Sequence, residues 1–374
     1  MKIDLITYSR TRNYGGILQA YGLYRYLELT GYDVSFIDYI PPRCNIQNRA
    51  VFVEEAVRKS RIWGMNRLTK AAFSMLCYPA VREAFQPFLA FLDQRAEFTK
   101  PYYSIEELNR DIPIADIYIT GSDQVWNSQF SREQRLDLPF YLPFVQKGIK
   151  ISYASSFGRG CIPEHDRETV RKLLSSYHAV SVREPSGKTL LAQLGIAAET
   201  TVDPTILCPL SEWEDLAGRR LEHRYFLLYQ VGFSREISEL AQAAAKKAGK
   251  KLLTVTLDRR RNFGPGIRAA VPVEDWLSYI RYADGVITDS FHACVFSILF
   301  RVPFLVNSGT RKELSARIGS LLEISALDSL CENSFELKTV LRILNGQPDW
   351  EEAHRRLKIQ REKSIRWLSR ALGT

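Results

Sequence analysis

The chain has 374 residues, of which 45% are hydrophobic and 25% charged, and its formal net charge is +9. This length favours two domains. No stretch approaches the roughly 18 uninterrupted apolar residues of a membrane span, and we expect no signal peptide. The six scattered cysteines indicate reduced thiols in a cytoplasmic protein. No zinc-finger spacing or RNA-binding signature accompanies the basic charge, so we expect no nucleic-acid partner, which leaves anionic substrates, an anionic membrane surface or a solvated basic surface.

The N-terminal segment follows a β-α-β pattern. A β-rich run at residues 2–8 leads into a polar turn, an apolar segment with helical spacing, and a second strand at Asp33–Tyr39. A right-handed crossover makes the two strands parallel neighbours, which places the turn where open α/β sheets bind ligands. A plain tight turn is the alternative. As ligand contacts the turn offers Asn13, Tyr14, Gly15 and Gly16.

Residues 43–110 form a helical insertion in this pattern. Its basic side chains, among them Arg49, Arg58 and Arg67, outnumber the acidic ones, and apolar residues such as Trp63 and Phe73 form a stripe. A basic amphipathic segment can lie on an anionic bilayer, whereas most such segments pack on their own domain. Both interpretations stay open.

Two further strand ends in this half carry polar side chains. The strand at residues 112–120 runs into GSDQVWN, where Asp123 and Gln124 suit hydrogen bonds to sugar hydroxyls and Trp126 suits stacking on a sugar face. The alternative is a capped turn with Trp126 in the core. The strand at Ala179–Val182 leads into Arg183, whose planar fork suits a carboxylate or phosphate, with a structural salt bridge to Glu184 as the alternative.

The strand–helix pattern restarts after about residue 208. Its clearest stretch is 285–304, which reads as a buried strand, a turn with Ser290, and an apolar helix with His292 in its first turn. Helix N-termini attract anions, so His292 is a candidate proton donor or phosphate contact, with a satisfied core histidine as the alternative. Other strand-to-helix loops add cations at the same sheet edge: Arg235, Arg311 and Lys312.

Six segments, in this order, resemble motifs of the polysaccharide pyruvyl transferase family: NYGGILQAYGLYRYL, GSDQVWN, YASSFG, SVREPSG, VDPT and ITDSFHACVFSILFRVPF. They are distributed from about residue 12 to about residue 320, a span that includes most of the chain. One departure is Ala293, where the family has glycine after the histidine, but His292 and Ser290 are in place.

The resemblance implies an α/β protein with two Rossmann-like domains facing each other across a cleft, as in GT-B glycosyltransferases. We expect an N-terminal domain at residues 1–208, which carries the helical insertion and binds the acceptor. A C-terminal domain at residues 209–349 would bind the donor phosphate, and an amphipathic helix at residues 350–374 would close the chain.

The resemblance also implies an enzyme that moves pyruvyl from phosphoenolpyruvate onto two hydroxyls of a sugar, as a ketal, in bacterial-type polysaccharide or glycan-precursor biosynthesis. Phosphoenolpyruvate is then the co-substrate, and neither a cofactor nor a metal is expected. His292 is the expected general acid, and Arg183 is the leading carboxylate or phosphate ligand. The further donor contacts expected are Ser290, Arg235, Arg311 and Lys312. The expected acceptor contacts are residues 13–16 with Asp123, Gln124 and Trp126.

Two alternatives stay open. A GT-B glycosyltransferase that uses a nucleotide sugar shares the architecture, and phosphate release from phosphoenolpyruvate would separate the two activities. A non-catalytic sugar- or phosphate-binding protein would bind without turnover. The sequence specifies neither the acceptor sugar, nor its linkage to a lipid, nor the oligomeric state. The basic insertion makes a location at the inner face of the cell membrane compatible with a cytoplasmic protein.

Overall fold

A computed structural model describes residues 1–58, 60–130, 135–158, 161–257, 266–306, 312–330 and 336–373. The chain divides into two compact units, Met1–Glu199 and Thr200–Thr374. We expected the boundary near residue 208, but the segment before it is tied to the second unit. The backbone N–H of Val202 donates to Ser364 Oγ, and Arg361 donates to the carbonyl of Leu207.

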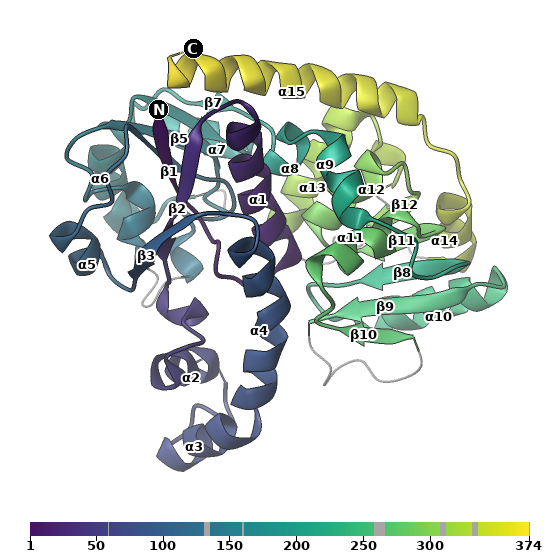
Figure 1. Cartoon of the computed structure of the whole chain (residues 1–374). Coiled ribbons are helices and arrows are strands. Elements are labelled where there is room, and N and C mark those ends of the chain that lie inside the picture. The colour runs from purple at the N-terminus through teal and green to yellow at the C-terminus, as the bar shows by residue number, and fades with distance from the viewer. Residues whose placement is uncertain are drawn as a thin grey trace. The chain divides into compact units, whose positions relative to one another are not determined.

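The first unit is built on a seven-stranded sheet with the order β3-β2-β1-β4-β5-β6-β7 (Figure 1). Its central strands are almost fully buried, as is typical of parallel sheets covered on both faces. The strands are β1 (Lys2–Ile6), β2 (Asp33–Tyr39), β3 (Phe98–Tyr102), β4 (Ile117–Thr120), β5 (Ile149–Ser155), β6 (Ala179–Val182) and β7 (Glu199–Thr200).

The helices of the first unit include the expected insertion, with one correction. Three helices lie at Arg49–Val57, Arg67–Leu76 and Tyr78–Asp93, but β3 follows them and adds an edge strand to the sheet, so the insertion is not helical throughout. The insertion has an apolar cluster of its own, centred on Val57, Phe73 and Phe85. The helices are α1 (Tyr14–Leu29), α2 (Arg49–Val57), α3 (Arg67–Leu76), α4 (Tyr78–Asp93), α5 (Ile105–Arg110), α6 (Glu164–Leu174) and α7 (Pro185–Ala192).

The second unit is built on a five-stranded sheet with the order β10-β9-β8-β11-β12. Its strands are β8 (Tyr225–Tyr229), β9 (Lys251–Thr256), β10 (Ile267–Ala269), β11 (Gly285–Thr288) and β12 (Phe304–Val306). The helices are α8 (Pro204–Leu207), α9 (Leu210–Ala217), α10 (Arg235–Lys247), α11 (Val273–Arg281), α12 (Phe291–Leu299), α13 (Lys312–Ser325), α14 (Leu337–Leu344) and α15 (Trp350–Leu372). The predicted C-terminal helix is confirmed as α15, which contacts α8, α12 and α13. An edge-to-face pair between Trp276 and Phe296 lies in the core between α11 and α12.

Each sheet reverses its strand order once, between β1 and β4 in the first unit and between β8 and β11 in the second. The pairings across both points are parallel. At these points the loops that follow the two paired strands lead away from each other, and open α/β sheets bind ligands in the crevice between such loops. The loops after these four strands are therefore the first places to look for a site. Among the described residues, no helix is long and apolar enough to cross a membrane.

Candidate active site

His292 lies in the first turn of α12, and its side chain is 10% exposed. Its Nε2 atom lies 3.4 Å from Oδ2 of Asp203, whose side chain is fully buried. Nε2 is buried, and within the described ranges no hydrogen bond of regular geometry reaches it. At this distance, a small rotation of the His292 ring would give Nε2 a hydrogen bond of regular geometry to the carboxylate. His292 and Asp203 therefore form a buried imidazole–carboxylate pair from distant parts of the chain.

The carboxylate of Asp203 is held in place by its own turn. Asp203 caps α8, and its Oδ1 atom accepts hydrogen bonds from the backbone N–H of Thr205 at 3.0 Å and from the Thr205 hydroxyl at 2.7 Å. Two donors on one oxygen leave the other oxygen directed at His292. This is the arrangement by which a carboxylate orients a histidine for proton transfer.

Ser290 is the N-cap of α12 and accepts a hydrogen bond from the backbone N–H of Ala293. Ala293 is fully buried at this point, so the methyl group that replaces the family's glycine is accommodated in the core. The cap fixes the first turn of the helix and with it the position of His292.

Asp289 closes the turn at the switch point of the second sheet. Its Oδ1 accepts from the backbone N–H of Val231 at 2.6 Å, and its Oδ2 accepts from that of Gly232 at 2.7 Å. A phosphate bound at this glycine turn would use the same N–H groups. Here the Asp289 carboxylate accepts from both N–H groups instead, and it thereby holds the loops after β8 and β11 together.

In the first unit, Asp123 follows β4 at the switch point. Its φ is +72°, a left-handed conformation that Asp and Asn adopt more readily than other side chains. The side chain is 20% exposed. A Cβ atom added at Gly16 would lie 3.5 Å from Asp123 Oδ2, so the carboxylate faces the first turn of α1. An acidic group in a sparsely populated conformation at a switch point is typical of functional sites.

Arg183 supports Asp123 from β6. Its side chain is only 3% exposed, and it lies 4.0 Å from Asp123 Oδ1 and 3.4 Å from Glu184 Oε1. Glu184 also accepts from the hydroxyl of Ser156 at 2.6 Å. The structural salt bridge that the sequence left as the alternative for Arg183 is therefore present.

Gln124 and Asn127 form a polar pair beside Asp123. The Asn127 amide donates to Gln124 Oε1 at 2.7 Å. Gly158, after β5, lies against both, because a Cβ atom there would meet Gln124 Oε1 at 2.1 Å and Asn127 Nδ2 at 2.6 Å. Loops from two neighbouring strands thus bring these residues together.

Trp126 corrects one expectation. Its side chain is 3% exposed, stacks on Tyr141 with ring centroids 5.6 Å apart, and packs at a tilt on Phe157. Its Nε1 donates to the carbonyl of Phe140. The ring is buried against aromatic neighbours, so Trp126 is a core residue and not a platform for a sugar.

The expected turn at residues 13–16 is the start of α1. Asn13 caps the helix by accepting from the backbone N–H of Gly16 at 3.1 Å. Tyr14 and Gly15 are buried in the first turn, with the Tyr14 ring packed on Phe88. Of the expected contacts here, Asn13 alone keeps a partly exposed side chain.

Arg43 was not singled out from the sequence. It follows β2, and its guanidinium lies 4.4 Å from the centre of the Tyr8 ring, at the end of β1. Close by, the Tyr39 hydroxyl donates to Asp137 at 2.6 Å. Burial raises the pKa of the Asp137 carboxyl, opposed by this hydrogen bond and by the Arg43 charge. Its position after the strand next to β1 is the signal that could have identified Arg43.

Of the other predicted donor contacts, the structure describes the side chain of Arg235 alone. Arg235 is exposed and pairs with Glu239 one turn along α10. Arg311 lies outside the described residues, and Lys312 is placed only as the first residue of α13. In the described part of the chain, no three His, Cys, Asp or Glu side chains gather in a way that would hold a metal ion.

The sequence matches the family model described as polysaccharide pyruvyl transferase over residues 13–307. The match includes every named strand except β1, and it includes His292, Asp203, Asp123 and Arg183. No curated protein matches the chain in a sequence comparison.

Two solved structures resemble the fold over the whole chain. One is a UDP-N-acetylglucosamine 2-epimerase, with a TM-score of 0.51, 11% identity and coverage of 100% of this chain and 96% of that one. The other is a co-structure of S. aureus MnaA with UDP, with a TM-score of 0.50, 11% identity and coverage of 100% and 97%. At this identity the likeness concerns the fold alone. With the two parallel sheets, it confirms the predicted α/β class with Rossmann-like units of the GT-B type.

Proposed function

The chain belongs to the polysaccharide pyruvyl transferase family, and from that premise we propose that it transfers pyruvyl from phosphoenolpyruvate to two hydroxyl groups of a sugar. The product is a cyclic ketal, and phosphate is released. The observation that carries the proposal is the buried pair of His292 and Asp203, because the reaction must begin with a proton delivered to carbon.

The proposed chemistry conserves atoms and charge. A protonated His292 gives its proton to the methylene carbon of phosphoenolpyruvate, so that the carbon bearing the phosphate becomes oxocarbenium-like. A sugar hydroxyl attacks this carbon and loses its proton, which restores the imidazolium. The carbon–oxygen bond to phosphate then breaks, the second hydroxyl closes the ketal, and its proton leaves with the phosphate.

His292 is the proposed general acid, and Asp203 is its positioning residue. With Nε2 directed at the Asp203 carboxylate, the proton for the substrate would come from Nδ1. A positioned general acid typically contributes about 10²- to 10⁴-fold in rate. Because the proton donor is a side chain, the proposed reaction needs no metal, and treatment with EDTA should leave the rate unchanged.

We assign the donor's phosphate and carboxylate to the second unit. The N-terminus of α12 with Ser290 is next to His292 in the chain and carries the positive end of a helix dipole. Arg235, Arg311 and Lys312 stay predictions as further donor ligands.

We assign the acceptor to the first unit, where Asp123 accepts a hydrogen bond from a sugar hydroxyl. Gln124 and Asn13 are its neighbours on the adjoining loops and suit further hydroxyls. Arg183 is a positioning residue in this proposal. Its buried guanidinium is already within 4.0 Å of two carboxylates, so its charge serves to hold Asp123 and Glu184.

A donor and acceptor screen tests the proposal. The full chain is incubated with phosphoenolpyruvate or with nucleotide sugars, each with a panel of sugars, and products are read by mass and by released phosphate. A sugar that gains the pyruvyl mass with release of one phosphate supports it. Turnover of a nucleotide sugar alone would establish the glycosyltransferase alternative. Binding without turnover that is unaffected by His292→Gln would establish a binding protein.

A further inference from the structure

The far end of the helical insertion exposes an apolar surface that has no partner in its own unit. Of the 15 large hydrophobic side chains that are exposed in the described ranges, five lie within residues 62–76. They are 66% to 81% exposed, which is extreme for large apolar groups: Ile62, Met65, Leu68, Met75 and Leu76. We call this surface the tip. Large exposed apolar groups concentrated in one short segment indicate an interaction site.

Helix α3 presents apolar residues on two sides. Its inward side holds the buried Phe73, which packs edge-on against Trp63 with ring centroids 5.8 Å apart. Leu68 and Met75 lie two turns apart on another side, which faces outward. Asn66 and Thr69 form a capping box at the start of the helix. The outward apolar side therefore belongs to a well-formed helix.

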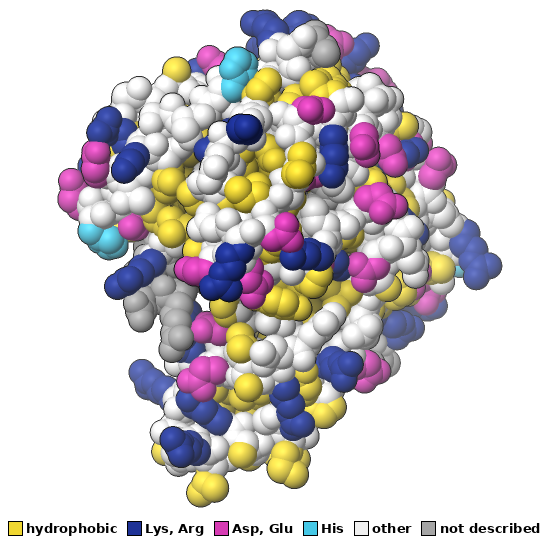
Figure 2. Space-filling view, turned by 60° about the vertical axis from the view of Figure 1, so that its left-hand side comes forward, with side chains coloured by type: hydrophobic (Ala, Val, Ile, Leu, Met, Phe, Trp, Pro, Cys, Tyr) yellow, Lys and Arg dark blue, Asp and Glu magenta, His cyan; other side chains and the backbone are white. Residues whose placement is uncertain are grey.

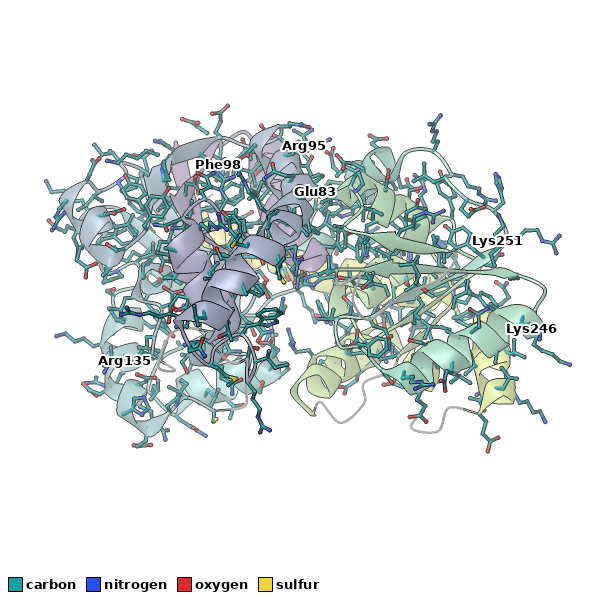
Figure 3. The ribbon with its side chains drawn as sticks, turned by 90° about the horizontal axis from the view of Figure 1, so that it is seen from below. Glu83, Arg95, Phe98, Arg135, Lys246 and Lys251 are labelled. Carbon is teal, nitrogen blue, oxygen red and sulfur yellow. The ribbon has the colours of Figure 1, made fainter. Side chains whose placement is uncertain are left out.

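The charged residues of the segment that forms the tip are all basic. Residues 56–82 contain six Lys and Arg and no Asp or Glu. Arg61 and Arg67 are exposed beside the apolar residues, whereas Lys70 pairs with Glu54 on α2. Figure 2 shows hydrophobic side chains at the lower end of the molecule with Lys and Arg around them, and Figure 1 places α2 and α3 at that end. In Figure 3, Lys246 and Lys251 of the second unit extend outward, and Lys251 pairs with Glu222.

We propose that the tip inserts shallowly into the surface of an anionic lipid bilayer. Exposed apolar side chains flanked by Lys and Arg are the composition of interfacial membrane-binding segments. Acidic headgroups complement the cations, which a second copy of the same tip would repel. Flexible Met, Leu and Ile side chains on a protruding end suit a soft hydrocarbon boundary better than a shaped protein pocket. This inference does not rest on the proposed function.

Vesicle flotation of the full chain tests it. The protein is mixed with vesicles of phosphatidylcholine alone or of phosphatidylcholine with phosphatidylglycerol, at low and at high salt. We expect binding to the anionic vesicles, weakened by salt. Neutralising three cations in Arg58→Gln/Arg61→Gln/Arg67→Gln should reduce partitioning roughly 100-fold. The variant Leu68→Ser/Met75→Ser/Leu76→Ser should lose binding at either salt concentration.

The matched control is Arg167→Gln/Arg171→Gln/Lys172→Gln, which removes the same charge from α6 in the same unit. It should bind as the unmodified protein does. No binding to any vesicle, or equal loss in the control, would overturn the proposal. So would concentration-dependent self-association that the serine variant abolishes, or selective binding to an acidic protein without lipid binding. Thermal unfolding of each variant confirms that the fold is retained.

Discussion

The Nε2 atom of His292 lies 3.4 Å from Oδ2 of Asp203, although the two residues come from different helices at distant points of the chain. The carboxylate is buried and anchored by Thr205, and the histidine begins a capped helix. The Asp203 carboxylate cannot turn away without breaking its hydrogen bonds with Thr205. The pair therefore defines the most direct tests of the proposed chemistry.

Replacing His292 should remove the proton donor and leave the fold intact. We expect His292→Gln to lower kcat about 10²- to 10⁴-fold, with little change in Tm, because glutamine can still donate to Asp203. The matched control is His354→Gln in the same unit, whose ring nitrogen lies 2.8 Å from the carbonyl of Ile298. It should keep full turnover. Steady-state kinetics measures both, and near-normal kcat in His292→Gln would remove the residue from this role.

Replacing Asp203 by asparagine should affect the reaction through His292. Asn keeps an oxygen for the two donors of Thr205, so the turn of α8 should persist. We expect kcat to fall about 10- to 100-fold with KM nearly unchanged. A loss confined to kcat distinguishes this positioning role, because a displaced turn would also weaken substrate binding. A fall in Tm, or a rise in KM as large as the fall in kcat, would argue for a purely structural role.

Asp123 offers a test in the first unit that separates charge from conformation. Asp123→Asn keeps a side chain suited to φ of +72°, so Tm should hold while kcat/KM for the acceptor falls about 100-fold. Asp123→Val places a β-branched residue in the left-handed region and should also cost about 1–2 kcal/mol in stability. Unchanged kinetics in the Asn variant would contradict the assignment of the acceptor to this carboxylate.

Much of the fold could be predicted because buried parallel strands read as apolar runs. The bounds of β2 and β6 agree with those expected from the sequence, and α15 begins at the expected residue 350. The two missed strands, β3 and β10, are both edges. β3 contains Pro101, and β10 has three residues, none buried. An edge strand has a single neighbour and needs little apolar sequence, so its pattern is weak.

For the candidate site, the sequence could predict several of the residues but not the residues that they contact. Asp123, Arg183 and His292 follow strands directly, and the carboxyl ends of parallel strands meet at one edge of a sheet. Their contacts depend on the folded chain. The approach of Asp203 to His292 has no local signal. Trp126 in a polar turn looked exposed because the later segment that covers it, Leu138–Tyr141, has no regular pattern.

Gly158 tests the packing of Gln124 and Asn127. Gly158 and Gly249 have the same strained backbone, with φ of +66° and +65°, but a Cβ atom meets nothing within 4 Å at Gly249. In both Gly→Ala variants the free energy of unfolding should fall by about 1 kcal/mol, because alanine is strained in the left-handed conformation. Gly158→Ala should lose about 1 kcal/mol more by displacing the Gln124–Asn127 hydrogen bond, and KM for the acceptor should rise. Equal losses in denaturant unfolding would show that the polar pair is not held by this contact.

Asp137 should make stability depend on pH in a direction opposite to that of most carboxylates. Burial raises its pKa above the ordinary value of 3.8, against the hydrogen bond from Tyr39 and the charge of Arg43. Above that value the unfolded chain loses the Asp137 proton first, so this contribution to stability is present at low pH and is lost as pH rises through the folded pKa.

The variant Asp137→Asn tests this dependence, because it stays neutral and can still accept a hydrogen bond from Tyr39. We therefore expect the free energy of unfolding of the variant, relative to the unmodified protein, to increase from pH 4 to pH 7. Asp4, whose pKa burial also raises, is common to both proteins and cancels in this comparison. If this difference in free energy of unfolding stayed constant or decreased from pH 4 to pH 7, the charge of Arg43 would offset or outweigh the effect of burial on the Asp137 pKa.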